Sequence, residues 1–447
     1  MRDGPGSAGS WIAGNQNVQI QDVSGSTIQI TYGGQRRRVP LEPAVISVGN
    51  NVGAPAQLVR ARSGIVPYTA RAGLLADVQA WLGRGDAFAA CLVGGRGGSG
   101  KTRLGVELCE QVRESGWLRG LLTLSADQAA LEALADTPTA RLVVVDYAET
   151  RGEQLEVVLP LLASAGTEDH PVRVVLLVRS APRDDSDWTA LLRHRSHALD
   201  AVLNDTQQWI LDDRPLDAAE RVALFDAAAT ALTARADPAL TLPDAPGALS
   251  ERVFASPLMV VIAGYLAVHG SSKLPTSKAD LLEELLHHER RYWKHSATAH
   301  GIDHDPDLAQ RIIALATLAG ADSEFEAAGL LKLIPDLADA SAKERRRLAR
   351  WIHGLYPGSA WWNPLEPDLI GEHLVATTLT DMPPVLTGVL TRDAPYAVVQ
   401  PLNLYAVKAR RNSPLVLMGI PHLVAWGTSW FGLMDRSRWR SPGPQNA

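Results

Sequence analysis

The stretch AACLVGGRGGSGKT, at positions 89–102, decides the fold. Its first part is apolar and predicts a buried strand over 88–93. From Gly95 onward it matches the pattern G-x-x-x-x-G-K-[ST] of a phosphate-binding loop. The glycines let consecutive backbone N–H groups turn inward around phosphate oxygens, because no Cβ obstructs the turn. The residues of this predicted cradle are Gly95, Arg96, Gly97, Gly98, Ser99, Gly100, Lys101 and Thr102.

The residues after the loop predict a helix, because Leu104, Leu108 and Val112 fall on one face at helical spacing. The helix N-terminus would then point at the bound anion. Lys101 is expected to reach the β- and γ-phosphates of a nucleotide, and the Thr102 hydroxyl to ligate Mg²⁺. Strand, loop and helix in this order are the context that the motif requires.

Two further apolar runs end in charged residues that suit a nucleotide site. The run 142–145 ends at Asp146, which would hold Mg²⁺ as a Walker B carboxylate. Glu149 is the candidate for orienting or deprotonating the attacking water; the alternative is a solvent-facing glutamate at a helix start. The run 172–178 ends at Arg179, which could sense the γ-phosphate from the carboxyl end of its strand. The alternative for Arg179 is an ordinary surface salt bridge.

Composition limits the class of protein. The 447 residues include 43 basic and 49 acidic ones, for a formal charge of −6. This balance gives no strong nucleic-acid signal, since phosphate-binding chains usually carry a basic face. Cys91 and Cys109 are too few for a disulfide framework. The N-terminus lacks the apolar core of a signal peptide, so a cytoplasmic location is expected.

Apolar runs alternate with amphipathic helical patterns over 63–212, which predicts an α/β domain: a P-loop NTPase parallel sheet flanked by helices. Strand signals then fade, and the Ala- and Leu-rich patterns that follow predict an all-α helical domain over 213–275. Residues 35–62, with an arginine run and several prolines, are predicted to be a linker.

Residues 1–34 are rich in Gly, Ser, Asn and Gln, and contain the triplets VQI at 18–20 and IQI at 28–30. Their alternation predicts two short strands and a turn. Segments of this kind can stack in register between chains, which predicts a β-prone, amyloid-like signalling motif, otherwise flexible. The alternative is a tail, or a small hairpin packed on the rest of the protein.

The C-terminal part departs from this pattern. The uncharged stretch 413–434 has about the length of a membrane span, although it contains Pro414 and Pro421. It is interpreted either as a membrane or interfacial segment or as a buried helix. The change in composition from Asn412 suggests that 381–447 is a helical remnant with a truncated or frame-shifted end.

Together the motifs resemble the STAND class of P-loop NTPases, the NACHT and NB-ARC relatives that act as signalling switches. VPYTAR at 66–71, ending in Arg71, is similar to the family's lead-in, whose backbone receives adenine; Ala70 stands in place of its glycine. DYAE at 146–149 is similar to the NACHT Walker B, with Tyr147 replacing a small residue. ASPL at 255–258 is similar to the helical-domain element whose proline, here Pro257, packs beside the nucleotide.

The resemblance extends to PLEPDLIGEHLV at 364–375, which is similar to the family's winged-helix segment and implies a winged-helix-like region over 276–380. In NACHT relatives a histidine there contacts the ADP β-phosphate; by register that place falls near Pro367 or Asp368 rather than on His373. Several blocks also resemble actinobacterial ATP-binding proteins that carry C-terminal TPR repeats. The segment GNQNVQI at 14–20 is similar to amyloid-type, RHIM-like signalling motifs.

The resemblance implies an ATP-dependent switch with slow hydrolysis that controls oligomerisation, with a role in bacterial conflict or defence. ATP or ADP and Mg²⁺ would be its ligands, with the metal on Thr102 and Asp146. Lys101, Asp146, Glu149 and Arg179 would carry the chemistry. Self-association on ATP binding, an effector reached through residues 12–34 and a protein trigger are the implied partners. A nucleotide-gated adaptor without useful turnover and a small-molecule phosphotransferase remain as alternatives.

Overall fold

The computed structural model describes residues 10–13, 18–23, 27–32, 34–46, 53–69, 71–124, 126–179, 197–204, 206–236, 242–270, 273–302 and 305–390. The chain divides into two compact units, Met1–Gly301 with Leu365–Ile370, and Ile302–Pro364 with Gly371–Ala447. Ala70, the stretch 413–434 and the expected start of the TPR repeats lie outside the described residues, so the interpretations placed on them stay predictions.

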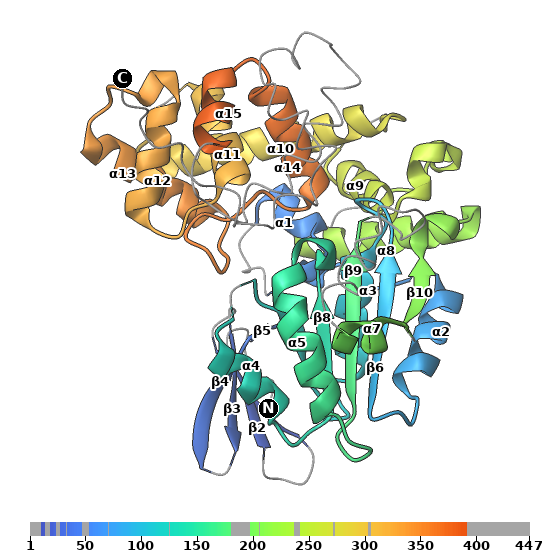
Figure 1. Ribbon diagram of the computed structural model, residues 1–447. Coiled ribbons are helices and arrows are strands. Elements are labelled where there is room, and N and C mark those ends of the chain that lie inside the picture. Colours follow the sequence, from blue (N-terminus) through green and yellow to red (C-terminus); the bar gives the residue numbers. More distant parts are fainter. Residues whose placement is uncertain are drawn as a thin grey trace, which may run out of the picture. The chain divides into compact units, whose positions relative to one another are not determined.

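A six-stranded sheet forms the centre of the first unit (Figure 1). In the order of the sheet, its strands are β10 Gln207–Ile210, β6 Phe88–Gly94, β9 Val172–Val178, β8 Arg141–Val145, β7 Leu118–Leu122 and β5 Leu41–Glu42. All neighbours are parallel except β5, which pairs antiparallel with β7. The predicted α/β class with helix-flanked parallel strands is confirmed at this level, and the antiparallel β5 makes the sheet mixed.

Helices cover both faces of the sheet, which explains why its central strands are nearly continuous apolar runs. Alternate strand residues, such as Cys91 and Val144, face α2 Ala72–Leu82 and α3 Lys101–Gln111. The residues between them, such as Leu92 and Val143, face α4 Gln128–Ala135, α5 Gly152–Ala165 and α7 His197–Asn204.

The strand order brings three loops together. Strand β9 follows β8 in the chain but lies between β6 and β8 in the sheet. Because these strands are parallel, their carboxyl ends meet at one edge, the place where α/β sheets bind ligands. The residues that follow them are the glycine-rich loop, Asp146 and Arg179.

The N-terminal residues form a second, antiparallel sheet of four strands: β1 Ser10–Ala13, β2 Val18–Val23, β3 Thr27–Tyr32 and β4 Gln35–Val39. Val18, Ile20, Ile28 and Ile30 are buried and join the apolar core that includes α4 and α5. Helix α4 packs against β4 (Figure 1). The predicted strands therefore take the alternative form, a sheet packed on the rest of its unit, while residues 14–17 and 24–26 lie outside the described chain.

The prediction of a linker over 35–62 is corrected by the structure. This stretch contributes β4, β5, α1 Pro55–Val59 and the short 3₁₀ helix η1 Ala61–Ser63. The sequence gives no apolar strand signal for β4, because its arginines are exposed and only Val39 at its end is buried. Edge strands commonly carry such exposed charges.

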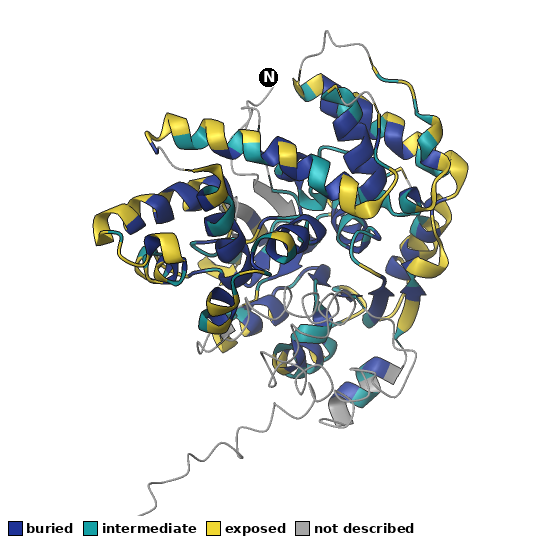
Figure 2. Ribbon diagram, turned by 90° about the horizontal axis from the view of Figure 1, so that it is seen from above, coloured by how far each residue is buried: buried dark blue, intermediate teal, exposed yellow. Residues whose placement is uncertain are grey.

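The remaining part of the first unit is helical, with elements listed here in chain order: η3 Leu211–Asp213, α8 Ala218–Ala236, η4 Gly247–Ser250, η5 Arg252–Ala255, α9 Pro257–Val268 and α10 Lys278–Ala299. Helix α9 is buried over Met259–Leu266, whereas α10 alternates buried and exposed residues. Figure 2 shows this one-sided burial in the surface helices. Pro257 occupies the first turn of α9, where its missing N–H leaves no helical bond unmade.

The second unit consists of helices: α11 Pro306–Ala319, α12 Glu324–Leu330, η6 Leu331–Leu333, η7 Pro335–Leu337, α13 Ala342–Leu355, the greater part of α14 Asp368–Thr378, and α15 Pro383–Leu390. Three of them start at side chains that accept a first-turn N–H, Asp305, Ser323 and Ser341. In the described part of this unit the only β structure is one bridge, between Ala321 and Trp362.

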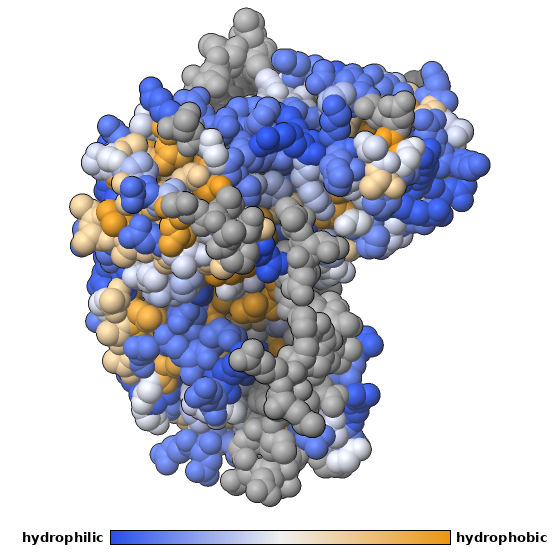
Figure 3. Space-filling view, turned by 180° about the vertical axis from the view of Figure 1, so that it is seen from behind, coloured by the Kyte–Doolittle hydropathy of each residue, from blue (hydrophilic) through white to orange (hydrophobic). Residues whose placement is uncertain are grey.

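In the face drawn in Figure 3, hydrophilic residues predominate and apolar ones occur in separate groups. No helix within the described ranges combines the length and the apolar character needed to cross a bilayer.

Candidate functional site

The loop between β6 and α3 has the conformation for which its glycines are needed. Gly98 has φ 80° and Gly100 φ 97°, both in the left-handed region that favours glycine. A Cβ on Gly95 would lie 2.7 Å from Ser99 Oγ. The Gly95 N–H donates to Val178 O at 3.1 Å, which ties the start of the loop to the end of β9. The glycine spacing read from the sequence thus corresponds to a tight, sheet-anchored turn.

Lys101, the first residue of α3, folds back onto this loop. Its Nζ donates to Gly95 O at 2.5 Å and to Arg96 O at 3.1 Å. The side chain is buried, and this burial lowers the pKa of Lys101, while nearby Asp146 opposes the shift. The ammonium group therefore lies against the loop backbone, where an anion held by the loop could replace the two carbonyls.

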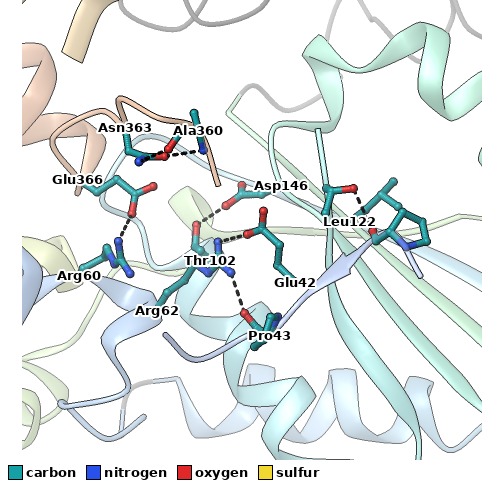
Figure 4. Close-up of polar contacts among 12 residues, drawn as sticks. Glu42, Pro43, Arg60, Arg62, Thr102, Leu122, Asp146, Ala360, Asn363 and Glu366 are labelled. Atoms are coloured by element: carbon teal, nitrogen blue, oxygen red, sulfur yellow. Dashed lines mark hydrogen bonds and ion pairs between the residues drawn. The ribbon is translucent and has the colours of Figure 1, made fainter. Parts of the chain in front are cut away.

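Thr102 and Asp146 bring two oxygen ligands together beside the loop. Thr102 Oγ1 donates to Asp146 Oδ2 at 2.9 Å (Figure 4), and Asp146 Oδ1 accepts from the Tyr147 N–H at 3.0 Å. Burial raises the pKa of Asp146, against the opposing Thr102 hydrogen bond and Lys101 charge. A hydroxyl and a carboxylate are hard donors of the kind that Mg²⁺ takes together with water and phosphate oxygens.

Two protein oxygens, from Thr102 and Asp146, are available to a cation at this point. Among the described residues, no group of three or more His, Cys, Asp or Glu side chains could hold a metal ion by itself. The two-oxygen set of Thr102 and Asp146 fits a cation that is completed by phosphates and water.

Glu149 has one engaged and one open carboxylate oxygen. Tyr147 turns the chain at φ 55° and ψ 43°, a left-handed conformation that is uncommon for a bulky residue, and starts the 3₁₀ helix η2 Ala148–Thr150. Glu149 Oε1 accepts from the Arg179 backbone N–H at 3.0 Å. Its Oε2 is buried and has no hydrogen-bond partner in the described part of the chain. Burial also raises the pKa of Glu149, so the solvent-facing alternative does not match this environment.

Arg179 follows β9 and makes a long-range ion pair. Its Nη2 lies 2.9 Å from Asp368 Oδ2, and both side chains are partly buried. The guanidinium carbon lies 5.4 Å from the centre of the Tyr147 ring, within cation–π range. The alternative of a salt bridge is realised, but with a partner that lies in the site rather than on an open surface.

Arg71 supports the loop from behind. Its Nη1 donates to Ser99 O at 2.6 Å and its Nε to Arg214 O at 2.8 Å, while its backbone N–H donates to Glu220 Oε1 at 2.7 Å. Arg71 is buried, and this burial lowers the pKa of its guanidinium. These contacts make Arg71 a brace for the glycine-rich loop.

The N-terminus of α9 clamps the same loop from another side. Pro257 Cγ lies 3.5 Å from the position of a Cβ on Gly100. Ser256 Oγ donates to Gly98 O at 2.9 Å, and the Leu258 N–H approaches the same oxygen at 3.3 Å. The sequence singled out Pro257 and missed the two polar contacts that flank it.

Arg96 belongs to the site through its backbone. Its N–H donates to the carboxylate of Asp212 at 3.1 Å, whereas its side chain is 88% exposed. Its Nε also lies 3.7 Å from Asp212 Oδ2, so the backbone and the side chain of Arg96 share one partner.

The segment Leu365–Ile370, which belongs to the first unit, also contacts the loop. A Cβ on Gly97 would lie 2.9 Å from Leu369 Cδ2, and one on Gly98 would lie 3.0 Å from Leu369 Cδ1. Glu366 in the same segment pairs with Arg60 at 3.1 Å (Figure 4). The sequence pointed to this segment only through the register near Pro367 and Asp368, and gave no sign of the Leu369 contact.

Comparisons with known proteins add no identification to this geometry. A scan against models of protein families found no match. A search of curated proteins found no match either.

Proposed function

We propose that this chain is an ATP-binding switch of the STAND type, with slow ATP hydrolysis. The observation that carries the proposal is the meeting of four features at one edge of one sheet. These are a glycine loop with its lysine, the Thr102–Asp146 oxygen pair, the open oxygen of Glu149, and Arg179. Each has the chemistry that a bound nucleoside triphosphate requires.

The phosphates would bind within residues 95–102. Lys101 would exchange two loop carbonyls for phosphate oxygens, with which an ammonium makes stronger, charge-assisted bonds. Thr102 and Asp146 would hold Mg²⁺, which neutralises phosphate charge when bound. Arg71 and the start of α9 would keep the loop in shape without touching the phosphates.

Glu149 would orient the attacking water. Its Oε1 is fixed by the Arg179 N–H, which leaves Oε2 to accept a hydrogen bond from water. A carboxylate whose pKa is raised by burial is a better proton acceptor than an ordinary glutamate, because its conjugate acid is weaker. If Glu149 has no such role, the chain would be an adaptor that binds nucleotide without useful turnover.

The same proposal covers partners and location. Self-association on ATP binding, an effector reached through residues 12–34 and a protein trigger follow from the resemblance. The cytoplasmic location expected from the sequence is part of the same proposal. The helical part over 213–275 and the region over 276–380 would be the helical and winged-helix-like domains. Because Ile20 and Ile28 are buried, stacking through the N-terminal strands would require their sheet to leave α4 and α5.

The proposal is tested on freshly purified protein that has met no added nucleotide. Acid extraction should release near-stoichiometric ADP from the wild-type chain and none from Lys101→Ala. Lys332→Ala is the matched control, since Lys332 is an exposed lysine in η6 and its loss should leave the extracted ADP unchanged. A wild-type chain that is empty and binds neither ADP nor ATP would refute the proposal.

A further inference from the structure

The nucleotide site has an acidic segment docked on it. Leu369 contacts the backbone of Gly97 and Gly98 so closely that side chains at those positions would collide with it. Asp368 and Glu366, beside it, are held by Arg179 and Arg60. An apolar contact and two ion pairs thus help to fix the segment Leu365–Ile370 within the first unit.

The carboxylates of Asp368 and Glu366 contribute to the electrostatics of the candidate site. Burial lowers the pKa of Lys101 and raises the pKa of Asp146; the charge of Asp368 opposes the first shift, and the charge of Glu366 adds to the second. Both carboxylates therefore lie near the residues that would hold phosphate and Mg²⁺. A nucleotide that brings more negative charge to this point meets more repulsion.

Arg179 is where the segment and a triphosphate would compete. The attacking water must lie beside the terminal phosphate, so Glu149 marks the place of that phosphate in the proposed site. The backbone N–H of Arg179 bonds Glu149, and the guanidinium of Arg179 pairs with Asp368. A γ-phosphate that paired with Arg179 would have to displace the Asp368 carboxylate, whereas a diphosphate would leave this ion pair intact.

We propose that Asp368 is a specificity-determining residue of this site, whose carboxylate holds Arg179 in the place of a γ-phosphate and so favours ADP over ATP. This inference rests on the proposed function. A ligand shifts an equilibrium only through its different affinity for the two states. Here the difference is the Asp368–Arg179 ion pair. By linkage, ATP binding and the docking of Leu365–Ile370 would weaken each other by the same factor.

The test compares the dissociation constants of Mg-ADP and of Mg-AMPPNP, a non-hydrolysable ATP analogue, for the full-length chain. Asp368→Asn keeps the size of the side chain and removes its charge. It should shift the ratio of the two constants toward AMPPNP by about tenfold, within the usual range of coupling between ligands. Asp368→Glu should keep the wild-type preference for ADP.

A matched control is available in Asp336→Asn, because Asp336 also pairs with an arginine at 2.9 Å, in the second unit. It should leave the ratio unchanged. Hydrogen exchange gives a second readout on the wild-type protein: amides of 365–370 should lose protection with AMPPNP and keep it with ADP.

The outcomes separate the two claims. If both nucleotides bind but Asp368→Asn leaves the ratio unchanged, or weakens both equally, the inference is overturned and the proposed function stands. If the wild-type chain binds neither nucleotide, the proposed function fails and the inference fails with it.

Discussion

At the scale of single residues, two cations of the site, Lys101 and Arg179, bond oxygens of the chain itself. Lys101 bonds the carbonyls of Gly95 and Arg96, and Arg179 bonds the carboxylate of Asp368. A phosphate would bind by replacing these partners with stronger, charge-assisted ones. A phosphate displaces a neutral carbonyl from a cation more easily than it displaces a carboxylate. We therefore expect Lys101 to bind any diphosphate, and Arg179 to distinguish among nucleotides.

Glu149→Gln should slow ATP hydrolysis while leaving ATP binding nearly unchanged. The substitution keeps an oxygen for the Arg179 N–H but removes the charged acceptor for the water proton. General-base catalysis contributes about a hundredfold or more, so single-turnover phosphate release should fall by at least that factor. Glu153→Gln, at an exposed glutamate in the first turn of α5, is the control and should hydrolyse ATP like the wild type. Equal rates in Glu149→Gln and wild type would leave the adaptor interpretation.

The pH dependence of hydrolysis should report the burial of Glu149. Burial raises the pKa of Glu149, so its base form is lost at a higher pH than for an exposed glutamate. The rate should therefore fall as the pH falls through this raised pKa, and be constant above it until another group titrates. Single-turnover rates across the acidic range would measure this limb. If the rate of Glu149→Gln falls over the same pH range, the titrating group is not Glu149.

At the scale of elements, the strands that are buried on both faces were predictable and the edge strands were not. Strands β6, β8 and β9 occur within one residue of the predicted runs, because their sequences are continuously apolar. Strand β7 starts three residues before the apolar run 121–124, since Arg119 interrupts the apolar pattern. Strands β4 and β10 were missed, because exposed Arg and Gln side chains on edge strands give no apolar run.

The candidate site also has one part that the sequence predicts and another that it does not. The loop, Lys101 and the Thr102–Asp146 pair follow from local spacing and from the rule that parallel strands end at one edge. The bracing role of Arg71 depends on Ser99 and Arg214, and the partner of Arg179 lies 189 residues away. Such contacts are set by tertiary packing, which no local pattern in the sequence records.

Ser256→Ala should make nucleotide dissociate faster. Ser256 Oγ donates to Gly98 O, and the loss of one such bond costs about 1 kcal/mol, or about fivefold in an equilibrium. Because the bond holds the loop that would hold the phosphates, stopped-flow release of a fluorescent ADP should be several-fold faster. Ser250→Ala removes a similar bond, to Gly247 O in an exposed 3₁₀ helix, and should not change release. Equal release rates in both variants would remove α9 from the site.

The packing of the N-terminal sheet makes a separate prediction about stability. Ile20 is fully buried in the core shared with α4 and α5, whereas its neighbour Gln19 is exposed. Ile20→Ala should lower the free energy of unfolding by about 2–5 kcal/mol, the usual cost of such a cavity. Gln19→Ala should change it by less than about 0.5 kcal/mol. Urea denaturation would measure both; equal small effects would mean that this sheet is not part of the folded core.

At the scale of the whole molecule, the N-terminal strands have two possible packings for the same apolar side chains. In the structure, Val18, Ile20, Ile28 and Ile30 are buried against the rest of the first unit. In a stack of chains they would be buried against copies of themselves. Side chains that are buried against the rest of the first unit are not available for stacking between chains. The full-length chain should therefore stay free of fibres while its sheet is docked.

This competition predicts opposite behaviour for the peptide and the protein. A peptide of residues 12–34 lacks the covering helices, so it should form thioflavin-positive fibres, whereas the ADP-loaded full-length chain at equal concentration should not. A peptide with Ile20→Asp and Ile28→Asp is the control, because a charge at each buried position would prevent dry stacking. Ile20→Ala in the full-length chain should weaken the docked sheet without forming fibres, provided that the strands stay attached to α4 and α5. A wild-type peptide that stays monomeric over days would exclude stacking by these strands, and the effector would then have to be reached through another surface.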